Sequence, residues 1–366
     1  MTKPRPILLA AGGTGGHLFP AVALAAALRQ RGAAVELVTD ARALKYGGEI
    51  PVDAIHSIPA ATTTGAGAFN KARATAVLGL GLIAALALLA RLKPRAVVGF
   101  GGYPTVPPLL AARLLGAPSV LHEQNAVAGR ANRFLAPRVS RVATGFPEIK
   151  GLGAALAAKT RYTGNPVRPA VIAAAAIAYP GFGDGRLCVL VTGGSQGARV
   201  MADVVPAALA LLSADERARL RLTMQARGED RERVATACAA IRFPVEVADF
   251  FADLPARIAS AHLVIGRSGA STVSELAVIG RPSILVPFPH ALDQDQAANA
   301  AILAAAGAAT VLPQTEFTSQ RLADLLRMAL ADPAALGKAA AAAQSVGVAN
   351  AADRLADVVI EVARPA

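Results

Sequence analysis

Short apolar runs alternate with amphipathic stretches along the whole chain. In the first half, apolar runs that predict buried strands lie at residues 5–11, 35–39, 96–100 and 119–121, and residues 18–31 have helical spacing. The pattern restarts later, with predicted strands at 187–192, 263–266 and 283–286 and a helix at 198–212. Such alternation is typical of parallel sheets with helices on both faces, so we predict an α/β fold.

An internal repeat indicates two domains. Residues 7–28 and 188–212 both read as a strand, a Gly-Gly-x-x-Gly turn and a helix, as in the start of a Rossmann-like domain. A chain of 366 residues also suits two cores better than one. Gly and Pro punctuate residues 163–166, so we place the domains at 1–164 and 165–345. We expect a helix at about 346–366 to pack back on the first domain.

Three glycine-rich turns follow predicted strands. GGTGGH (12–17) and GGSQG (193–197) each open a helix, and GFGGYP (99–104) ends another apolar run. Helix N-termini attract phosphates, and glycine lets the backbone approach a ligand; tight turns alone are the plainer explanation. The chain has no GxxxxGK[ST] motif and lacks the third glycine of GxGxxG. Because Asp40 ends the second strand, a dehydrogenase remains a rival interpretation.

Two polar clusters follow predicted strands. His122, Glu123, Gln124 and Asn125 come after the run at 119–121, where an open α/β sheet binds ligands. Residues 267–275, RSGASTVSE, follow the strand at 263–266 and should open a helix. Glu275 there could accept hydrogen bonds from a ribose diol or act as a capping-box acid. Residues 293–295, Asp-Gln-Asp, resemble a metal-binding DxD motif, but no third carboxylate accompanies them, so we expect no metal.

Charge separates the two halves. Residues 1–164 contain 19 Lys and Arg against 6 Asp and Glu, a net charge of +13, whereas residues 165–366 carry −1. The basic half predicts an anionic partner. Without a nucleic-acid motif or any Trp, an anionic membrane surface is the better expectation, and we expect no nucleic-acid partner. Cys188 and Cys238 read as free thiols of a cytoplasmic protein, and no secretory signal is visible.

One long uncharged stretch, residues 74–90, is bracketed by basic residues. Lys71 and Arg73 precede it, and Arg91, Lys93 and Arg95 follow. It is at the short limit for crossing a bilayer, which needs about 20 apolar residues. An apolar surface ringed by positive charge suits a protein that lies on an anionic leaflet. A buried core helix is the alternative, and Gly79 and Gly81 weaken the segment as a helix.

Taken together and in order, the motifs resemble the MurG family of N-acetylglucosaminyltransferases of peptidoglycan synthesis. The set is GGTGGH, GFGGYP, HEQN, TGNPVR (163–168), GGSQGAR, RSGASTVSE and residues 287–296, and it covers nearly the whole chain. The resemblance implies a GT-B fold, with two Rossmann-like domains and a cleft between them. It implies transfer of N-acetylglucosamine from UDP to the muramyl 4-hydroxyl of lipid I, giving lipid II, without a cofactor or metal.

The resemblance also implies site residues. Thr14, Gly15, Gly16 and Asn125 would lie near the transferred sugar, Arg168 and Ser195 near the nucleotide and its diphosphate, and Phe251 would line the uracil pocket. The implied diphosphate and ribose site comprises Ala270, Ser271, Thr272, Val273, Ser274 and Glu275. Gln296 would reach the sugar hydroxyls. Asp295 departs from the Gln or His of some relatives, so Gln294, Asp295 and Gln296 all remain candidates for that contact.

A general base must accept the proton of the acceptor hydroxyl. His17 is the first candidate because histidine titrates near neutral pH; Glu123 and His122 are rivals. The implied partners are UDP-N-acetylglucosamine, lipid I, the anionic membrane on its cytoplasmic face, where the enzyme would be peripheral, and cell-wall synthesis proteins. A non-enzymatic nucleotide-sugar or phospholipid binder of the same fold is the rival function.

Overall fold

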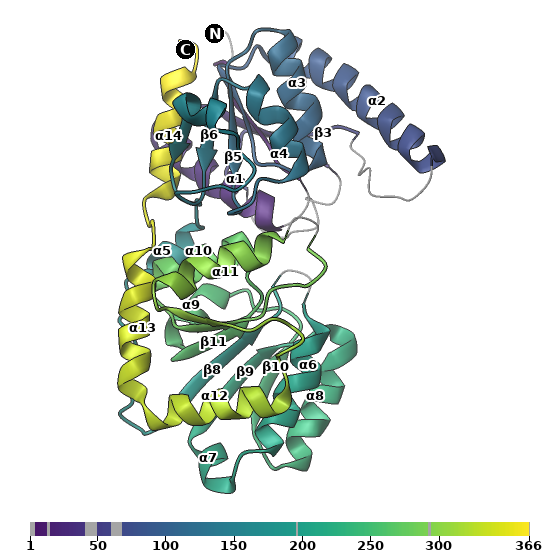
Figure 1. The fold of residues 1–366 in the computed structure, drawn as a ribbon. Helices are drawn as coiled ribbons and strands as arrows, with labels where there is room; N and C mark the ends of the chain where they lie inside the picture. The colour runs from purple at the N-terminus through teal and green to yellow at the C-terminus, as the bar shows by residue number, and fades with distance from the viewer. Residues whose placement is uncertain are drawn as a thin grey trace. The chain divides into compact units, whose positions relative to one another are not determined.

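A computed structural model describes residues 4–12, 15–40, 50–59, 68–194, 197–291 and 294–365. The chain divides into two compact units: Met1–Arg168 with Ala349–Ala366, and Pro169–Val348. Each unit is built around one parallel sheet with helices on both faces (Figure 1). The chain passes from the first unit to the second after residue 168, which is four residues after the boundary expected from the sequence.

The first unit contains a sheet of seven parallel strands in the order β3-β2-β1-β4-β5-β6-β7. The strands are β1 Ile7–Ala10, β2 Val35–Thr39, β3 Ala54–Ser57, β4 Ala96–Gly99, β5 Ser119–Glu123, β6 Arg141–Thr144 and β7 Thr160–Tyr162. Ile7 of β1 is in register with Val35 on one side and Ala96 on the other. The chain order therefore reverses between β1 and β4.

Alternate side chains of β1 enter two separate cores, because successive strand residues point to opposite faces. Leu9 packs with α1 and α14, and Leu8 packs with α2 and α3. The helices are α1 Gly15–Gln30, α2 Ala68–Leu92, α3 Val106–Leu114, α4 Arg130–Leu135 and α14 Ala351–Val362, with short 3-10 turns at η2 Tyr103–Thr105, η3 Ala136–Arg138 and η4 Ala154–Lys159. The C-terminal helix α14 thus completes the first core.

The second unit contains six parallel strands in the order β10-β9-β8-β11-β12-β13. They are β8 Leu187–Thr192, β9 Leu220–Gln225, β10 Val245–Ala248, β11 Leu263–Gly266, β12 Ser283–Leu285 and β13 Ala309–Val311. The helices are α5 Pro169–Ala175, α6 Arg199–Ala210, α7 Ala214–Ala218, α8 Gly228–Ala240, α9 Leu254–Ser260, α10 Ala270–Ile279, α11 Asp295–Ala305, α12 Ser319–Ala331 and α13 Pro333–Ser345. The chain order reverses between β8 and β11.

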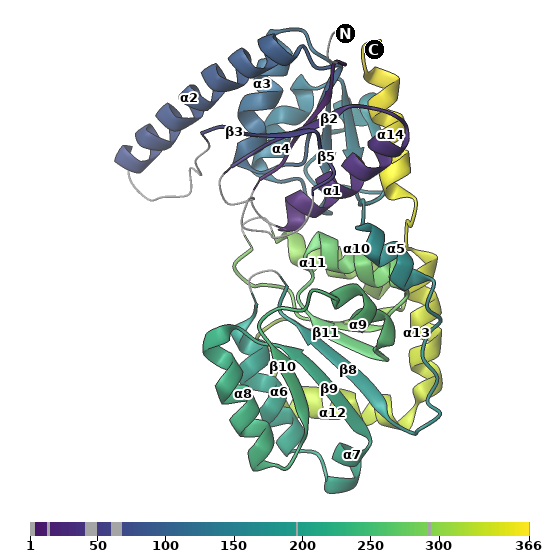
Figure 2. The same ribbon diagram turned by 180° about the vertical axis from the view of Figure 1, so that it is seen from behind.

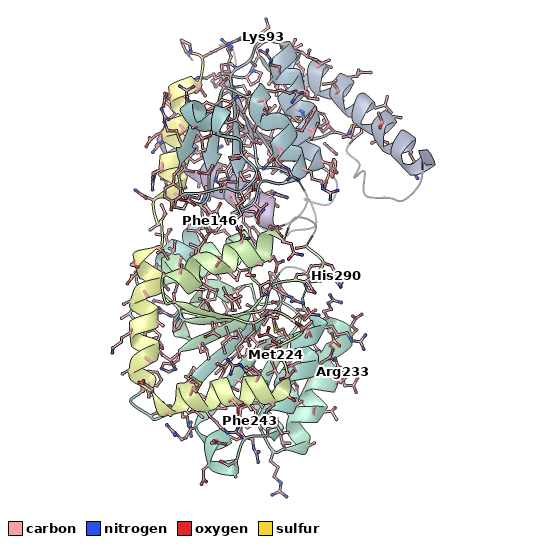
Figure 3. The ribbon with its side chains drawn as sticks, in the orientation of Figure 1. Lys93, Phe146, Met224, Arg233, Phe243 and His290 are labelled. Carbon is pink, nitrogen blue, oxygen red and sulfur yellow. The ribbon has the colours of Figure 1, made fainter. Side chains whose placement is uncertain are left out.

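The core of the second unit lies between the sheet and α6, α8 and α12. Met224 of β9 and Phe243, just after α8, both belong to it (Figure 3). The other side of the sheet carries α9, α5 and α10, with α9 lying over β8 and β11 in Figure 2. Both sheets thus have the doubly wound topology that the alternating sequence pattern predicts.

The helix α2 departs from one expectation. Its window Thr75–Leu92 is long and apolar enough to cross a membrane by length and composition, but only 22% of that window is buried. The core-helix alternative therefore holds for one face of the C-terminal half of α2 and not for the whole helix. Among the described residues, three are buried in the core and four more pack partly against it: Ala85, Leu88 and Leu89, then Leu82, Ala84, Leu86 and Leu92. Gly81 leaves space for the neighbouring backbone, because a Cβ at this position would lie 2.3 Å from the Pro59 carbonyl oxygen.

Candidate functional site

In the first unit, the predicted sugar-site loops meet where the strand order reverses. The turn after β1 and the turn after β4 lie at the carboxyl ends of neighbouring strands, which is where open α/β sheets bind ligands. Gly12, Gly15 and Gly16 belong to the first turn and to the start of α1. Thr14 lies outside the described residues.

His17, in the first turn of α1, is enclosed by glycines. A Cβ on Gly101 would lie 3.4 Å from Cε1 of the ring, and one on Gly102 would lie 3.4 Å from Nε2. Both glycines have positive φ, 83° and 75°. A side chain at either position would crowd the imidazole and strain the turn. The GFGGYP motif therefore makes room for His17, which is partly exposed.

His122 and Glu123 lie within β5, not after it as the sequence suggested, and both are buried. His122 Nε2 contacts the Gly164 carbonyl oxygen at 3.2 Å, so this nitrogen carries the proton. Burial, with a smaller contribution from His17, lowers the pKa of His122 to about 4. A neutral, fully buried imidazole cannot reach a substrate, so the geometry argues against His122 as the base.

Glu123 organises the segment that follows β5. One carboxylate oxygen accepts from the Asn125 backbone N–H at 2.9 Å; the other accepts from the Gly129 N–H at 3.0 Å and from Asn132 Nδ2 at 2.7 Å. Burial raises the pKa of Glu123, while these hydrogen bonds oppose the rise. Both oxygens are engaged, so Glu123 fixes the backbone of Asn125. Asn132 was missed because nothing in the sequence of α4 marks it.

The TGNPVR segment is hydrogen-bonded to the residue that follows β5. Asn165 Nδ2 donates to the Gln124 carbonyl at 2.9 Å, and Gln124 Nε2 donates to the Phe100 carbonyl at 2.6 Å. A Cβ on Gly145 would overlap the Asn165 amide, so glycine is needed there. These contacts join three motifs that are separate in sequence.

Arg168, the last residue of the first unit before α5, stacks on an aromatic ring. Its guanidinium carbon lies 4.4 Å from the centre of the Phe19 ring on α1. Such a cation–π contact fixes the orientation of a guanidinium. The stack holds Arg168 against the same helix that carries His17.

In the second unit, the turn after β8 needs its glycines. A Cβ on Gly193 would lie 2.2 Å from the Ala198 backbone nitrogen, and Gly194 and Gly197 have positive φ. The turn lies beside β11, where the strand order reverses. Ser195 lies outside the described residues.

The helix α10 begins after β11 with no capping side chain. Gly269 is its N-cap residue, so Glu275 lies in the second turn and the capping-box interpretation of Glu275 is wrong. Within the described part of the chain, the buried Ser271 hydroxyl has no hydrogen-bond partner. An uncapped helix N-terminus with an unpaired hydroxyl suits a phosphate. Ala270, Val273 and Glu275 are buried, and Thr272 and Ser274 are partly exposed; Ser274 Oγ donates to the Ala270 carbonyl at 2.8 Å.

Arg267 and Ser268 fix the loops around α10. Arg267 donates to the Val286 and Pro287 carbonyls and to Gln314 Oε1. Ser268 Oγ donates to the Gln296 carbonyl at 2.8 Å, and Gln296 Oε1 accepts from the Phe288 N–H at 3.0 Å.

The candidates for the contact with the sugar hydroxyls lie before and at the start of α11. Gln294 has a left-handed φ of 55°, and Asp295 Oδ1 accepts from the Gln296 N–H at 2.9 Å. Phe251 is nearly buried, and Arg257 lies over its ring. Asp293 lies outside the described residues, and among those described no group of three or more His, Cys, Asp or Glu side chains is placed to hold a metal ion.

Two Rossmann-like domains, each with a glycine turn at its strand-order reversal, are the architecture of the GT-B class. Residues 7–144 match the glycosyltransferase family 28 N-terminal domain, and residues 188–355 match its C-terminal domain. The chain is 57% identical to a Methylobacterium UDP-N-acetylglucosamine--N-acetylmuramyl-(pentapeptide) pyrophosphoryl-undecaprenol N-acetylglucosamine transferase, over 99% of this chain and 98% of that one. It is 55% identical to the enzyme of the same name from Rhodopseudomonas palustris, over 99% and 97%. The chain belongs to this family of N-acetylglucosamine transferases.

Solved structures agree on the fold. MurG from Acinetobacter baumannii superposes with a TM-score of 0.77 and 30% identity, covering 98% of this chain and all of that one. A UDP-GlcNAc 2-epimerase from Neisseria meningitidis, bound to UDP-GlcNAc, has a TM-score of 0.66 at 14% identity, with 97% and 100% covered, and shows the fold alone. Membership of the transferase family contradicts the dehydrogenase and non-enzymatic alternatives.

Proposed function

We propose that the protein transfers N-acetylglucosamine from UDP-N-acetylglucosamine to the muramyl 4-hydroxyl of lipid I, forming lipid II. The observation that carries this proposal is the full-length identity of 53–57% to transferases of that name. The uncapped N-terminus of α10, where the Ser271 hydroxyl has no hydrogen-bond partner among the described residues, supports a diphosphate in the second unit. We therefore assign the donor to Pro169–Val348 and the acceptor to the first unit.

The reaction is a single inverting displacement. The acceptor oxygen bonds to the anomeric carbon, the bond from that carbon to the β-phosphate oxygen breaks, and UDP leaves with the electron pair. The α10 N-terminus and Arg168 would stabilise the charge on the departing diphosphate. Gly15, Gly16 and Asn125 would contact the sugar from the first unit, and Glu275 the ribose.

His17 is the base in this proposal. It is partly exposed, whereas Glu123 is 1% exposed with both oxygens already hydrogen-bonded. The proton of the acceptor hydroxyl would pass to the imidazole as the glycosidic bond forms. Glu123 would instead hold Asn125 in position.

We also propose that the first unit docks on the anionic cytoplasmic face of the membrane through α2. Figure 1 shows α2 alongside α3 at its C-terminal end, with its N-terminal end extending away from the sheet. Exposed residues of α2 at helical spacing form one apolar stripe: Ala76, Leu80, Ile83, Ala87 and Ala90. Leu80 and Ile83 are 60% and 65% exposed, and Arg73 and Arg91 flank the stripe. Apolar area plus positive charge is what binds anionic lipid.

The direct test is transfer of radiolabelled N-acetylglucosamine from UDP to a lipid I analogue. We expect a lipid II product whose formation survives excess EDTA, because helix N-termini and Arg168 take the place of a cation. If the folded protein forms no lipid II product, the proposed reaction is refuted. Activity lost in EDTA and restored by magnesium or manganese would return a metal role to Asp293 and Asp295.

A further inference from the structure

The loop between β10 and α9, residues 249–253, carries Phe251 at the carboxyl edge of the second sheet. Its start is fixed by Gln225 Nε2, which donates to the Asp249 carbonyl at 3.2 Å. Phe250 is 69% exposed, whereas Phe251 is 7% exposed. The two adjacent rings therefore have opposite environments: the Phe250 ring faces solvent and the Phe251 ring is buried.

Arg257, one turn into α9, lies over the Phe251 ring. Its guanidinium carbon lies 4.2 Å from the centre of the Phe251 ring. The same guanidinium donates from Nε to Asp253 Oδ1 at 2.8 Å and from NH1 to Glu246 Oε2 at 2.7 Å. These contacts raise the pKa of Arg257, so it stays charged. One side chain thus connects the loop, the helix after it and the strand before it.

A cavity of about 360 Å³ lies beside Arg257, lined also by Cys188, Thr223 and Ala256. The position of the guanidinium therefore depends on its two ion pairs more than on packing. Replacing Arg257 by a short side chain would enlarge the cavity and remove the contact with the Phe251 ring together with both ion pairs.

We propose that Arg257 is a positioning residue for nucleobase recognition: it fixes the backbone of residues 249–253, which reads the uracil edge of the donor. This rests on the proposed function. Backbone N–H and C=O groups discriminate between bases only when the loop that carries them is rigid. The base is remote from the bond that breaks, so loosening the loop weakens donor binding without changing the chemical step.

The test compares Arg257→Ala with Arg233→Ala in the full-length enzyme. Arg233, on α8 (Figure 3), makes a similar double ion pair with Asp203 and Asp230, so it is a matched control for loss of two ion pairs. For Arg257→Ala we expect KM for UDP-N-acetylglucosamine and the inhibition constant of UDP to rise about three- to tenfold with kcat within about twofold. The preference for UDP over CDP should fall. Arg233→Ala should leave all four quantities unchanged.

Two further variants separate positioning from general stability. Arg257→Lys keeps the charge but not the two-pronged geometry, so it should fall between wild type and Arg257→Ala. Phe251→Leu should weaken UDP binding, and adding Arg257→Ala to it should cause little further loss, because both act through one contact.

Unchanged UDP affinity and base preference in Arg257→Ala would overturn the inference, as would equal losses in Arg233→Ala. If the wild-type enzyme itself did not bind UDP, the proposed function would fail instead.

Discussion

At the scale of single residues, the two neighbouring groups His17 and His122 have opposite properties. His17 lies among glycines and is partly exposed, whereas His122 is fully buried in β5 and its Nε2 is committed to a backbone carbonyl. Desolvation disfavours a charged imidazole, so His122 stays neutral near neutral pH and His17 remains the candidate base.

Replacing His17 by Ala should lower kcat by on the order of a hundredfold or more, with UDP binding little changed. Steady-state kinetics with both substrates would measure it. His56→Ala is the control, since His56 is another half-buried histidine of the first unit and contacts Glu36 at 2.7 Å. If only the acceptor KM rises, His17 binds the acceptor and Glu123 becomes the better base.

Replacing Glu275 by Ala should weaken UDP binding roughly ten- to hundredfold, because a charge-assisted hydrogen bond to the ribose is lost. Calorimetric titration of UDP would give the dissociation constant, with Glu275→Gln as the variant that keeps the shape. The exposed Glu229 of α8 provides an Ala control in the same unit. A dissociation constant equal to that of wild type would remove Glu275 from the site.

His122 should make the first unit less stable at acid pH. Its pKa falls from 6.5 in the unfolded chain to about 4 in the fold, so below 6.5 the unfolded state binds a proton that the folded state does not. The stability present above pH 6.5 is lost as pH falls toward 4, by up to about 3 kcal/mol. Urea unfolding across this range would measure it.

The His122→Gln variant keeps a donor for the Gly164 carbonyl and does not titrate, so its stability should vary less with pH. The lowered pKa of His262 acts in the same direction and remains in both proteins. Equal pH dependence in variant and wild type would contradict the assignment.

At the scale of elements, one buried side chain connects three helix ends. Arg281 is 1% exposed, and its hydrogen-bond acceptors among the described residues are backbone carbonyls: Ala259 of α9, Ile279 and Gly280 at the end of α10, and Ile177 and Ala178 just beyond α5. Helix C-termini carry partial negative charge and unpaired carbonyls, so a guanidinium is well suited to this position. It fixes the far end of the helix whose start is proposed to bind the diphosphate.

Arg281→Met should therefore destabilise the second unit by about 3 kcal/mol or more, since several buried carbonyls lose their donor at once. Arg221→Met is the control: that side chain is 58% exposed and its ion pair with Asp184 should contribute at most about 1 kcal/mol. Urea unfolding with and without UDP would compare them. A midpoint unchanged by Arg281→Met would show that water or other groups satisfy these carbonyls.

At the scale of the molecule, charge and apolar surface are unequally divided between the two halves of the chain. The basic excess lies in residues 1–164, and so does α2 with its exposed apolar stripe. In the proposed reaction the acceptor is lipid-linked, so the unit that binds it must work at a membrane surface. A nearly neutral second half suits a unit that takes its donor from solution.

Changing Lys71, Arg73, Arg91 and Lys93 together to Gln should release the protein from vesicles containing anionic lipid. Each basic residue near such a surface contributes about 1 kcal/mol, and the binding should weaken with salt. The same four-charge change at Arg217, Arg221, Arg227 and Arg231 in the second unit is the control. Co-sedimentation measures binding, and a soluble short-chain acceptor should show retained activity. Equal vesicle binding by both variants, or none by wild type at low salt, would contradict docking through α2.

The fold class, the three glycine-rich turns and the family could all be predicted from the sequence. Buried parallel strands need apolar runs, and the turns at Gly101, Gly193 and their neighbours need glycine, so both leave a local signature that periodicity reveals. Strands such as β9 and β10 are half-exposed and polar on one side, so their sequence pattern is a weaker signal. The α10 start was correctly located, yet its N-cap was not, because Gly269 caps through its backbone alone.

Which side chains are buried, and which groups contact each other, could be seen only in the folded chain. Asn132 reaches Glu123, Asn165 reaches Gln124, and Arg281 reaches three helix ends across separations that no local pattern records. The same holds for α2: its composition suits a core, an interface or a membrane span, and its place beside α3 leaves one side exposed. Propensity and periodicity are short-range properties, whereas burial, pKa and ion pairing depend on whatever the rest of the chain brings alongside.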